Sequence, residues 1–185
     1  HVGSLPRSKA VTDLVFAKEN EQDYDPQLLS ETIVQAVDTV VARQVATGID
    51  VVSDGEMSKI SYATYIKDRI SGFDGDSERN PPSDLEEFPG FLQRQANSGG
   101  TPSYRRPCCV GAIAVKDMGP LEEDLNNFRA AVNSHGPLEG FMNAASPGVI
   151  ALFQPNKHYP SHESYLEALA EAMRAEYEAI VDAGF

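Results

Sequence analysis

An apolar strand that follows a helix without a linker is the feature that most constrains the fold of this chain. Apolar residues recur at helical spacing and stop near Gly48 (Ile33, Val34, Val37, Val40, Val41 and Val45). Ile49 to Ser53 then has the pattern of a buried strand that runs straight into Asp54-Gly55-Glu56. A helix that leads directly into an apolar strand is the repeating step of a parallel α/β sheet. The sequence therefore predicts such a sheet, with polar groups at the carboxyl end of this strand.

Strands and helices alternate along the rest of the chain as well. The predicted elements are strands at 108–115 and 137–145, helices at 57–72, 121–135 and 161–184, and a short helix or loop at 11–28. Ser161 is the expected N-cap of the last helix, and Gly184 is its stop signal. Residues 73–107 interrupt the alternation with Pro and Gly pairs and little periodicity, so we expect a long loop insertion there. A solvated insertion without function is the alternative.

These elements amount to about four strand–helix units. An eight-unit α/β barrel usually needs around 250 residues, whereas the chain has 185. The sequence therefore predicts the first four or so βα units of a (β/α)8 TIM barrel, with residues 1–185 as the N-terminal half of one domain. An open, four-stranded, doubly wound domain is the alternative that fits the length.

Composition excludes several classes of function. The formal charge of −13 disfavours nucleic acid and anionic membrane surfaces as partners, and no apolar run approaches the roughly 18 residues of a membrane span. Cys108 and Cys109 are adjacent, so a disulfide framework is not expected and a reducing cytoplasm fits best.

Three ordered segments resemble the catalytic barrel of cobalamin-independent methionine synthase and its shorter relatives. They are HVGSLPR at 1–7, GIDVVSDGE at 48–56 and the stretch from SPGVIALF to EAIVDAGF at 146–185. Epoxyalkane:coenzyme M transferase and uroporphyrinogen decarboxylase share this barrel. Asp54 stands where the methionine synthases have His and the shorter relatives have Asp, which weakens the inference of homocysteine as the specific thiol.

The resemblance implies a zinc-dependent methyltransferase of methionine biosynthesis. A methyl group would move from a folate-type donor or a corrinoid protein to a small-molecule thiol such as homocysteine, which Zn²⁺ converts to its thiolate. In the family the zinc ligands are one His, two separated Cys and a Glu, all in the second half of the barrel. Cys108 and Cys109 point to opposite faces of a strand, so they cannot form that site, and we expect no metal ligand among residues 1–185. We expect no catalytic residue among them either.

The resemblance also implies a set of substrate-binding residues. Val2, Gly3 and Ser4 would hold the carboxylate of the amino acid, and Glu56 would hold its amino group. Phe153 stands where the folate enzymes have a Trp beside the pterin, and Arg105 and Arg106 lie near the expected acidic tail of the donor. Each set has a purely structural alternative. Residues 2–4 could form a tight turn, and Glu56 could be a solvated carboxylate. Phe153 could belong to the core, and the two arginines could be a solvated pair.

Two other functions remain open at this point. A related barrel enzyme would add a thiol of the coenzyme M type to an epoxide, or would decarboxylate its substrate. A half-barrel with exposed strand edges is also compatible with a non-catalytic binding module or a homo-oligomer.

Overall fold

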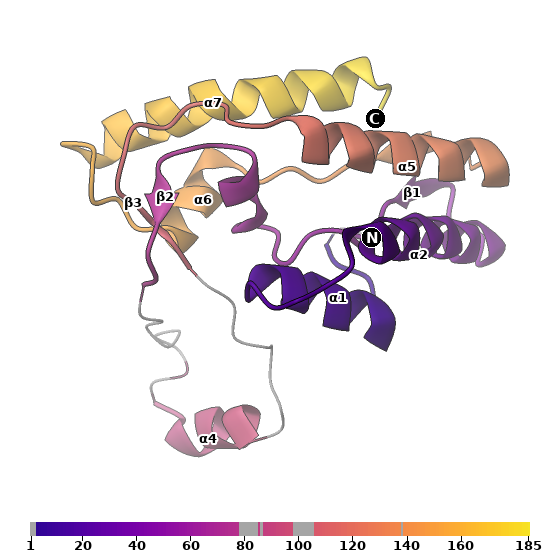
Figure 1. The fold of residues 1–185 in the computed structure, drawn as a ribbon, viewed down its shortest axis with the longest axis horizontal. Coiled ribbons are helices and arrows are strands. Elements are labelled where there is room, and N and C mark those ends of the chain that lie inside the picture. The colour runs from indigo at the N-terminus through magenta and orange to yellow at the C-terminus, as the bar shows by residue number, and fades with distance from the viewer. Residues whose placement is uncertain (1–2, 78–84, 86, 98–105, 138) are drawn as a thin grey trace.

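The computed structural model describes residues 3–77, 85, 87–97, 106–137 and 139–185 (Figure 1). Along the chain its elements are α1 (Lys9–Glu19), α2 (Pro26–Ala46), β1 (Val51–Ser53), the 3-10 helix η1 (Tyr65–Asp68), β2 (Phe73–Asp74), α4 (Pro89–Asn97), β3 (Cys108–Cys109), α5 (Gly119–His135), β4 (Glu139–Phe141), α6 (Pro147–Phe153) and α7 (His162–Asp182). The mixed α/β class predicted from the sequence is confirmed. Within these ranges no helix is long and apolar enough to cross a membrane.

The predicted parallel pairing is present between β1 and β4. Val52 lies opposite Gly140 in this two-stranded sheet, and α2 leads into β1 as the apolar pattern predicts. Helices α2 and α5 pack against each other beside the sheet (Figure 1). Because the two strands are parallel, the segments that follow them, after Ser53 and after Phe141, emerge at the same edge.

Two hydrophobic cores stabilise the chain. The first joins α1, α2, β1, α5 and the end of α7, and it includes the fully buried Phe128, whose ring centre lies 4.5 Å from that of Phe185. The second joins η1, α6 and α7 around Ile66, Ile150 and Tyr165. Each core is formed by apolar side chains from segments that are far apart in the sequence. Burial of these side chains therefore stabilises the tertiary structure and not one helix alone.

Local signals at the helix ends agree with the prediction. Ser161 and Ser164 form a capping box at the start of α7, in which each side chain accepts a hydrogen bond from the other residue's backbone N–H. Helix α5 ends on Gly136 in the left-handed conformation, with φ 60° and ψ 45°. The start of α7 and the end of α5 therefore follow from a few residues that can be recognised in the sequence.

The helix predicted at 57–72 is wrong. Apart from the single turn η1, this segment is irregular, and its carbonyls bond to side chains from elsewhere: Gln154 donates to Ala63 O (2.9 Å) and Arg7 donates to Lys59 O. Apolar and charged residues alike are buried along it, including Met57, Lys59 and Arg69. Tertiary contacts therefore satisfy the backbone in place of helical hydrogen bonds.

The strand predicted at 108–115 is mostly wrong. Only Cys108–Cys109 forms β3, and it pairs antiparallel with β2, outside the parallel sheet. Val110 and Gly111 both donate to Gly72 O, so the chain turns away after two residues. The described part of the parallel sheet therefore holds two strands, β1 and β4, and 137–145 contributes only Glu139–Phe141 to it.

The segment predicted as a loop insertion contains regular structure. Helix α4 lies away from the rest of the molecule in Figure 1, and the rings of Phe88 and Phe91 beside and within it are exposed. Residues 78–84, 86 and 98–105 of this segment, which include Arg105, lie outside the described residues. Helix α6 was not predicted, although Ser146 caps it by accepting from Val149 N.

We expect Gly72→Ala to destabilise the protein by about 2–3 kcal/mol. Gly72 has a φ of 93°, and a Cβ there would lie 2.7 Å from Gly111 O, which is backbone and cannot move aside. Gly148→Ala is the matched control, because Gly148 lies in α6 with open space around it. Urea unfolding of both variants measures the difference, and equal stabilities would contradict this account of the β2–β3 connection.

Candidate functional site

A buried glutamate stands at the carboxyl edge of the parallel strands. Glu56 follows β1 and is only 2% exposed, yet both of its carboxylate oxygens have donors. Ser4 Oγ donates to Oε2 (2.7 Å), and Asn143 Nδ2, which follows β4, donates to Oε1 (3.1 Å). Three segments of the chain therefore meet on one carboxylate.

The turn after β1 aims Glu56 at this point. Gly55 and Glu56 both have left-handed backbones, with φ 64° and 56°. Asp54 supports the turn by accepting from Glu56 N (3.0 Å), and Leu5 N donates to Gly55 O (3.1 Å). The same turn therefore orients the carboxylate and ties the N-terminal segment, with Ser4, beside it. A non-glycine residue with positive φ is uncommon and typical of functional sites.

Arg7 also binds this loop, through backbone carbonyls. Its Nη2 donates to Glu56 O (2.7 Å) and to Lys59 O. Burial lowers the pKa of Arg7, and the carboxylates of Glu56 and Asp54 act against that shift. Arg7 belongs to the HVGSLPR motif, and sequence reasoning gave it no role of its own.

A cavity of about 300 Å³ opens in front of this glutamate, lined by Gly3, Glu56, Lys59, Tyr62, Tyr65, Asn143 and Ala144. Of the residues predicted from the sequence, the structure brings Gly3, Ser4 and Glu56 together here. Val2 lies outside the described residues. In the structure the Ser4 hydroxyl bonds to Glu56, so it serves the carboxylate of the protein itself.

Phe153 and Arg106 form a second group beside this cavity. The Arg106 guanidinium lies over the Phe153 ring at 5.2 Å, and Phe153 meets Tyr62 edge to face at 5.6 Å. Because Tyr62 also lines the cavity, the group adjoins the cavity through that ring. Phe153 is half-buried at the end of α6, so it is neither pure core nor free surface.

Sequence reasoning missed three residues of the cavity: Lys59, Tyr65 and Asn143. Lys59 is 2% exposed, its Nζ donates to Asn143 O (2.7 Å), and it lies 5.0 Å from the centre of the Tyr65 ring. One signal for Asn143 was available, because it follows β4 as Glu56 follows β1. Lys59 and Tyr65 were hidden by their assignment to a helix.

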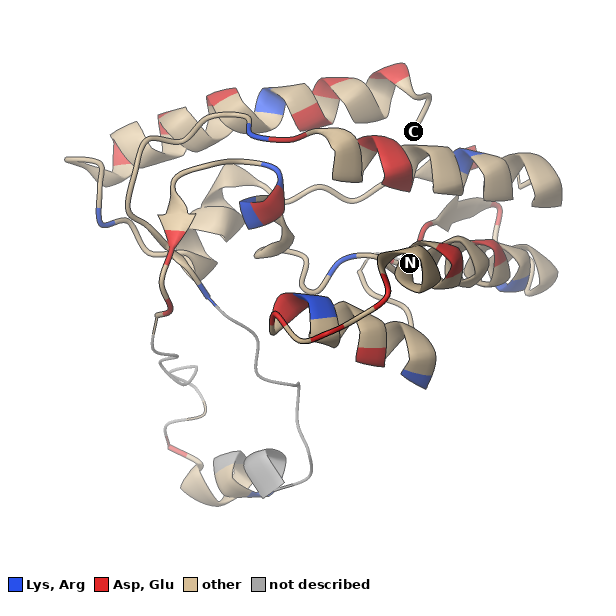
Figure 2. Ribbon diagram, in the orientation of Figure 1, with Lys and Arg blue, Asp and Glu red and all other residues tan. Residues whose placement is uncertain are grey.

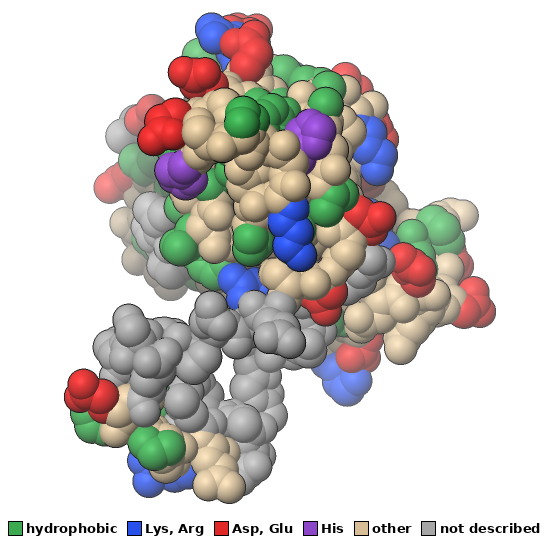
Figure 3. Space-filling view, turned by 90° about the vertical axis from the view of Figure 1, so that its left-hand side faces the viewer, with side chains coloured by type: hydrophobic (Ala, Val, Ile, Leu, Met, Phe, Trp, Pro, Cys, Tyr) green, Lys and Arg blue, Asp and Glu red, His purple; other side chains and the backbone are tan. Residues whose placement is uncertain are grey.

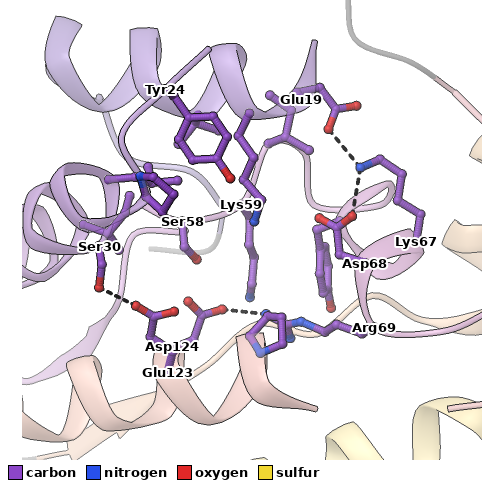
Figure 4. A pocket seen from close by; sticks show the side chains of 18 of the residues that line it. Glu19, Tyr24, Ser30, Ser58, Lys59, Lys67, Asp68, Arg69, Glu123 and Asp124 are labelled. Atoms are coloured by element: carbon purple, nitrogen blue, oxygen red, sulfur yellow. Dashed lines mark hydrogen bonds and ion pairs between the residues drawn. The ribbon is translucent and has the colours of Figure 1, made fainter. Parts of the chain in front are cut away.

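A larger cavity of about 480 Å³ lies between α1, α2, η1 and α5 (Figure 4), and Lys59 and Tyr65 line it as well as the first cavity. Its walls carry paired charges: Lys67 binds Glu19 (2.9 Å) and Asp68, and Arg69 binds Asp124. Arg69 also binds Glu176 (3.1 Å) from α7. Burial raises the pKa of Asp124 even though Arg69 acts in the opposite direction.

The described residues do not fit a zinc site. Among them, no three His, Cys, Asp or Glu side chains are grouped so that they could hold a metal ion. Cys108 and Cys109 are free and buried, and Cys109 Sγ approaches Gly111 O at 3.5 Å. Charges are spread over the surface of the helices, with acidic residues on α1, α2, α5 and α7 (Figure 2), and hydrophobic side chains lie scattered among polar ones on the face seen in Figure 3.

We expect the protein to lose stability above pH 10 partly through Tyr65. Its hydroxyl donates to Glu176 (2.6 Å) and accepts from Ala145 N, and burial, followed by the Glu176 charge, raises its pKa well above the ordinary value of about 10. The unfolded chain therefore loses this proton first. The stabilisation is complete below about pH 10 and is lost as the pH rises toward the folded-state pKa. Alkaline urea titrations should show a shallower decline for Tyr65→Phe, and identical slopes would refute this origin.

Comparison with known proteins finds chains similar to this one in one group of enzymes. No family model matches the chain. Methionine synthase from Sulfolobus acidocaldarius is 28% identical over 187 residues, which cover 99% of this chain and 48% of that protein. Methionine synthase from Sulfurisphaera tokodaii is 26% identical over 183 residues, with the same coverage. The chain thus spans about half the length of the curated relatives it matches.

Solved structures agree on the fold. A B12-independent methionine synthase from a Shewanella species, in complex with selenomethionine, has a TM-score of 0.64 and 20% identity over 87% of this chain and 41% of its own. A protein from Listeria monocytogenes assigned as a vitamin-B12-independent methionine synthase has a TM-score of 0.67 and 19% identity over 100% of this chain and 48% of its own. The predicted resemblance to cobalamin-independent methionine synthases is therefore confirmed, and the relatives are enzymes of methionine synthesis.

Proposed function

We propose that the protein containing this chain transfers a methyl group to the thiol of an amino acid, homocysteine, and that these residues form the amino-acid end of its site. The observation that carries the proposal is the buried Glu56, whose two oxygens are held by Ser4 and Asn143 at the edge of a 300 Å³ cavity. The relatives named methionine synthase support the reaction.

In this proposal Glu56 binds the ammonium group of the substrate. A carboxylate that accepts from two neutral donors still has lone pairs to offer, because each oxygen can accept more than one hydrogen bond. Little water reaches this position, so an ammonium bound there interacts more strongly than it would at an open surface. Gly3 lines the same cavity, where its backbone groups can contact the substrate. The site would thus orient the amino acid, leaving its thiol to reach toward the reacting centre.

The methyl donor would bind on the side of Tyr62. The rings of Tyr62 and Phe153 offer apolar surface to a flat group such as a pterin, and Arg106 offers a cation to an acidic tail. On the resemblance alone, Arg105 would bind the acidic tail together with Arg106. A corrinoid protein is the other class of donor in this proposal.

The remaining parts of the proposal concern fold, metal and compartment. We place β1 and β4 in a (β/α)8 TIM barrel, to which this chain contributes part. Zinc, where the reaction uses it, would be bound by residues other than the described ones, since these do not fit it. The free thiols of Cys108 and Cys109 favour a reducing compartment, the cytoplasm.

Turnover by the full natural protein tests this function. L-Homocysteine is supplied with a methyl-folate or with methylcobalamin, and methionine is measured by mass spectrometry. We expect methionine with at least one donor. Turnover of epoxypropane with coenzyme M and none with homocysteine would instead assign the protein to the thiol–epoxide branch of the superfamily.

A further inference from the structure

The dipeptide Asp-Gly occurs twice in the chain, in opposite surroundings. Asp54 is 3% exposed and Gly55 is buried, whereas Asp74 and Gly75 are both exposed. In an Asp-Gly sequence the backbone nitrogen of the glycine can attack the carboxyl carbon of the aspartate, because glycine has no Cβ to obstruct the ring that forms. The fold therefore decides which of the two aspartates can react in this way.

The backbone around Asp74 brings the reacting groups together. Gly75 N donates to Asp74 Oδ1 at 2.6 Å. Because Oδ1 is bonded to Cγ, the nitrogen lies close to the carbon that it would attack, and such proximity accelerates an intramolecular reaction. Gly75 has a φ of 75°, and a Cβ there would meet nothing within 4 Å, so the peptide unit has open space in which to turn.

The buried dipeptide has a different arrangement. Gly55 N donates to Ser53 Oγ (3.3 Å), and the Asp54 carboxylate accepts from Glu56 N (3.0 Å). Leu5 N holds the turn from the other side by donating to Gly55 O (3.1 Å). Ring closure at Asp54 would break these contacts, so it requires the turn to open first by local unfolding.

We infer that Asp74 converts spontaneously to a succinimide and then to isoaspartate in the folded protein, while Asp54 is protected. A bond forms between Gly75 N and Asp74 Cγ, the bond between Cγ and its hydroxyl breaks, and the N–H hydrogen and the hydroxyl leave as water. Water then adds to the ring and restores the original mass. When the bond from Gly75 N to the Asp74 backbone carbonyl carbon breaks, the main chain runs through the side-chain carbon and the residue is isoaspartate.

This modification lengthens the main chain directly before two hydrogen bonds that hold Arg106. Ser77 N donates to Arg106 O (2.8 Å), and Arg106 N donates to Asp76 Oδ1 (2.9 Å). The Arg106 guanidinium in turn lies over the ring of Phe153. Asp74 is thus a modification site at the base of the segment that carries Arg106, and its chemistry does not depend on methyl transfer.

Water enriched in the heavy isotope of oxygen reveals which aspartates pass through the ring. The full natural protein is aged in this water in the folded state, where each ring that opens takes up one heavy oxygen, and it is then digested with trypsin in ordinary water. Asp74 lies in the tryptic peptide 70–79 and Asp54 in the peptide 44–59. We expect peptide 70–79 to gain the label at least about tenfold faster, because the buried turn must open before it reacts. Electron-transfer fragmentation should show isoaspartate in the labelled peptide.

The same ageing in urea is the control for sequence. Unfolded protein should label both peptides at similar rates, since both contain Asp-Gly. Equal labelling of the two peptides in the folded protein would overturn the inference. So would a folded peptide 70–79 that stays unlabelled over the period in which its unfolded counterpart gains the label.

Two variants assign the label to one residue, because peptide 70–79 also contains Asp76. In Asp74→Glu the side chain would have to close a larger ring, which forms far more slowly, so the peptide should stay unlabelled. Asp76→Glu is the matched control and should keep the label. A label that persists in Asp74→Glu and disappears in Asp76→Glu would show that Asp76 reacts instead.

Discussion

Glu56→Gln is expected to weaken the binding of L-homocysteine about 30- to 1,000-fold, the largest loss for any single change in the site. Removing one partner of a buried, hydrogen-bonded charge pair typically costs about 2–5 kcal/mol, and every 1.4 kcal/mol is tenfold in affinity. Glutamine keeps the size of the side chain, and one of its two positions can still accept from Ser4 or Asn143. The change therefore removes mainly the charge that the ammonium needs.

Calorimetry on the full natural protein measures this effect, with Glu167→Gln as the control. Glu167 lies on the exposed face of α7, far in sequence from the cavity, and its neutralisation should leave the Kd unchanged. The affinity of 4-mercaptobutanoate, which has no ammonium, should not fall in Glu56→Gln. A loss smaller than threefold for L-homocysteine would remove Glu56 from the binding site.

Arg69→Met should produce the largest loss of stability, about 3–5 kcal/mol in the free energy of unfolding. Arg69 is 4% exposed and lies between Asp124 and Glu176, which belong to α5 and α7. Its pKa is raised: burial lowers it, but the two carboxylates outweigh that effect. Without the guanidinium, the two buried carboxylates lose their cation and remain as uncompensated buried charges.

Urea unfolding at neutral pH measures this loss, with Arg174→Met as the control. Arg174 pairs with Glu171 on the open surface of α7, so its replacement should leave the stability unchanged. The deficit of Arg69→Met should shrink as the pH falls, because protonation removes the uncompensated charges and Asp124 already has a raised pKa. A deficit that is constant from pH 7 to pH 4 would indicate lost packing instead.

The elements that the sequence predicted well are those with local signals. Helix α2 and strand β1 follow from apolar spacing and Gly48, and α7 follows from its capping serine and apolar stripe. The segment at 57–72 could not be predicted in this way, because its apolar spacing imitates a helix while distant partners such as Gln154 and Asn143 determine its path. Short strands such as β3 likewise depend on a partner that is distant in sequence.

The residues of the candidate site likewise divide into those with local sequence signals and those without. Gly3, Ser4 and Glu56 lie in recognisable motifs, and the structure brings them together. Lys59 and Tyr65 could not be found from sequence, because nothing local distinguishes a buried lysine from a solvated one; its burial results from packing against the loop after β4.

A crystal structure of the full natural protein with L-homocysteine tests the central claim most directly. We predict that the substrate nitrogen lies within about 3 Å of a Glu56 carboxylate oxygen, inside the cavity between Gly3 and Asn143. Homocysteine bound elsewhere, with Glu56 still bonded only to Ser4 and Asn143, would show that this glutamate supports the fold and does not bind the substrate.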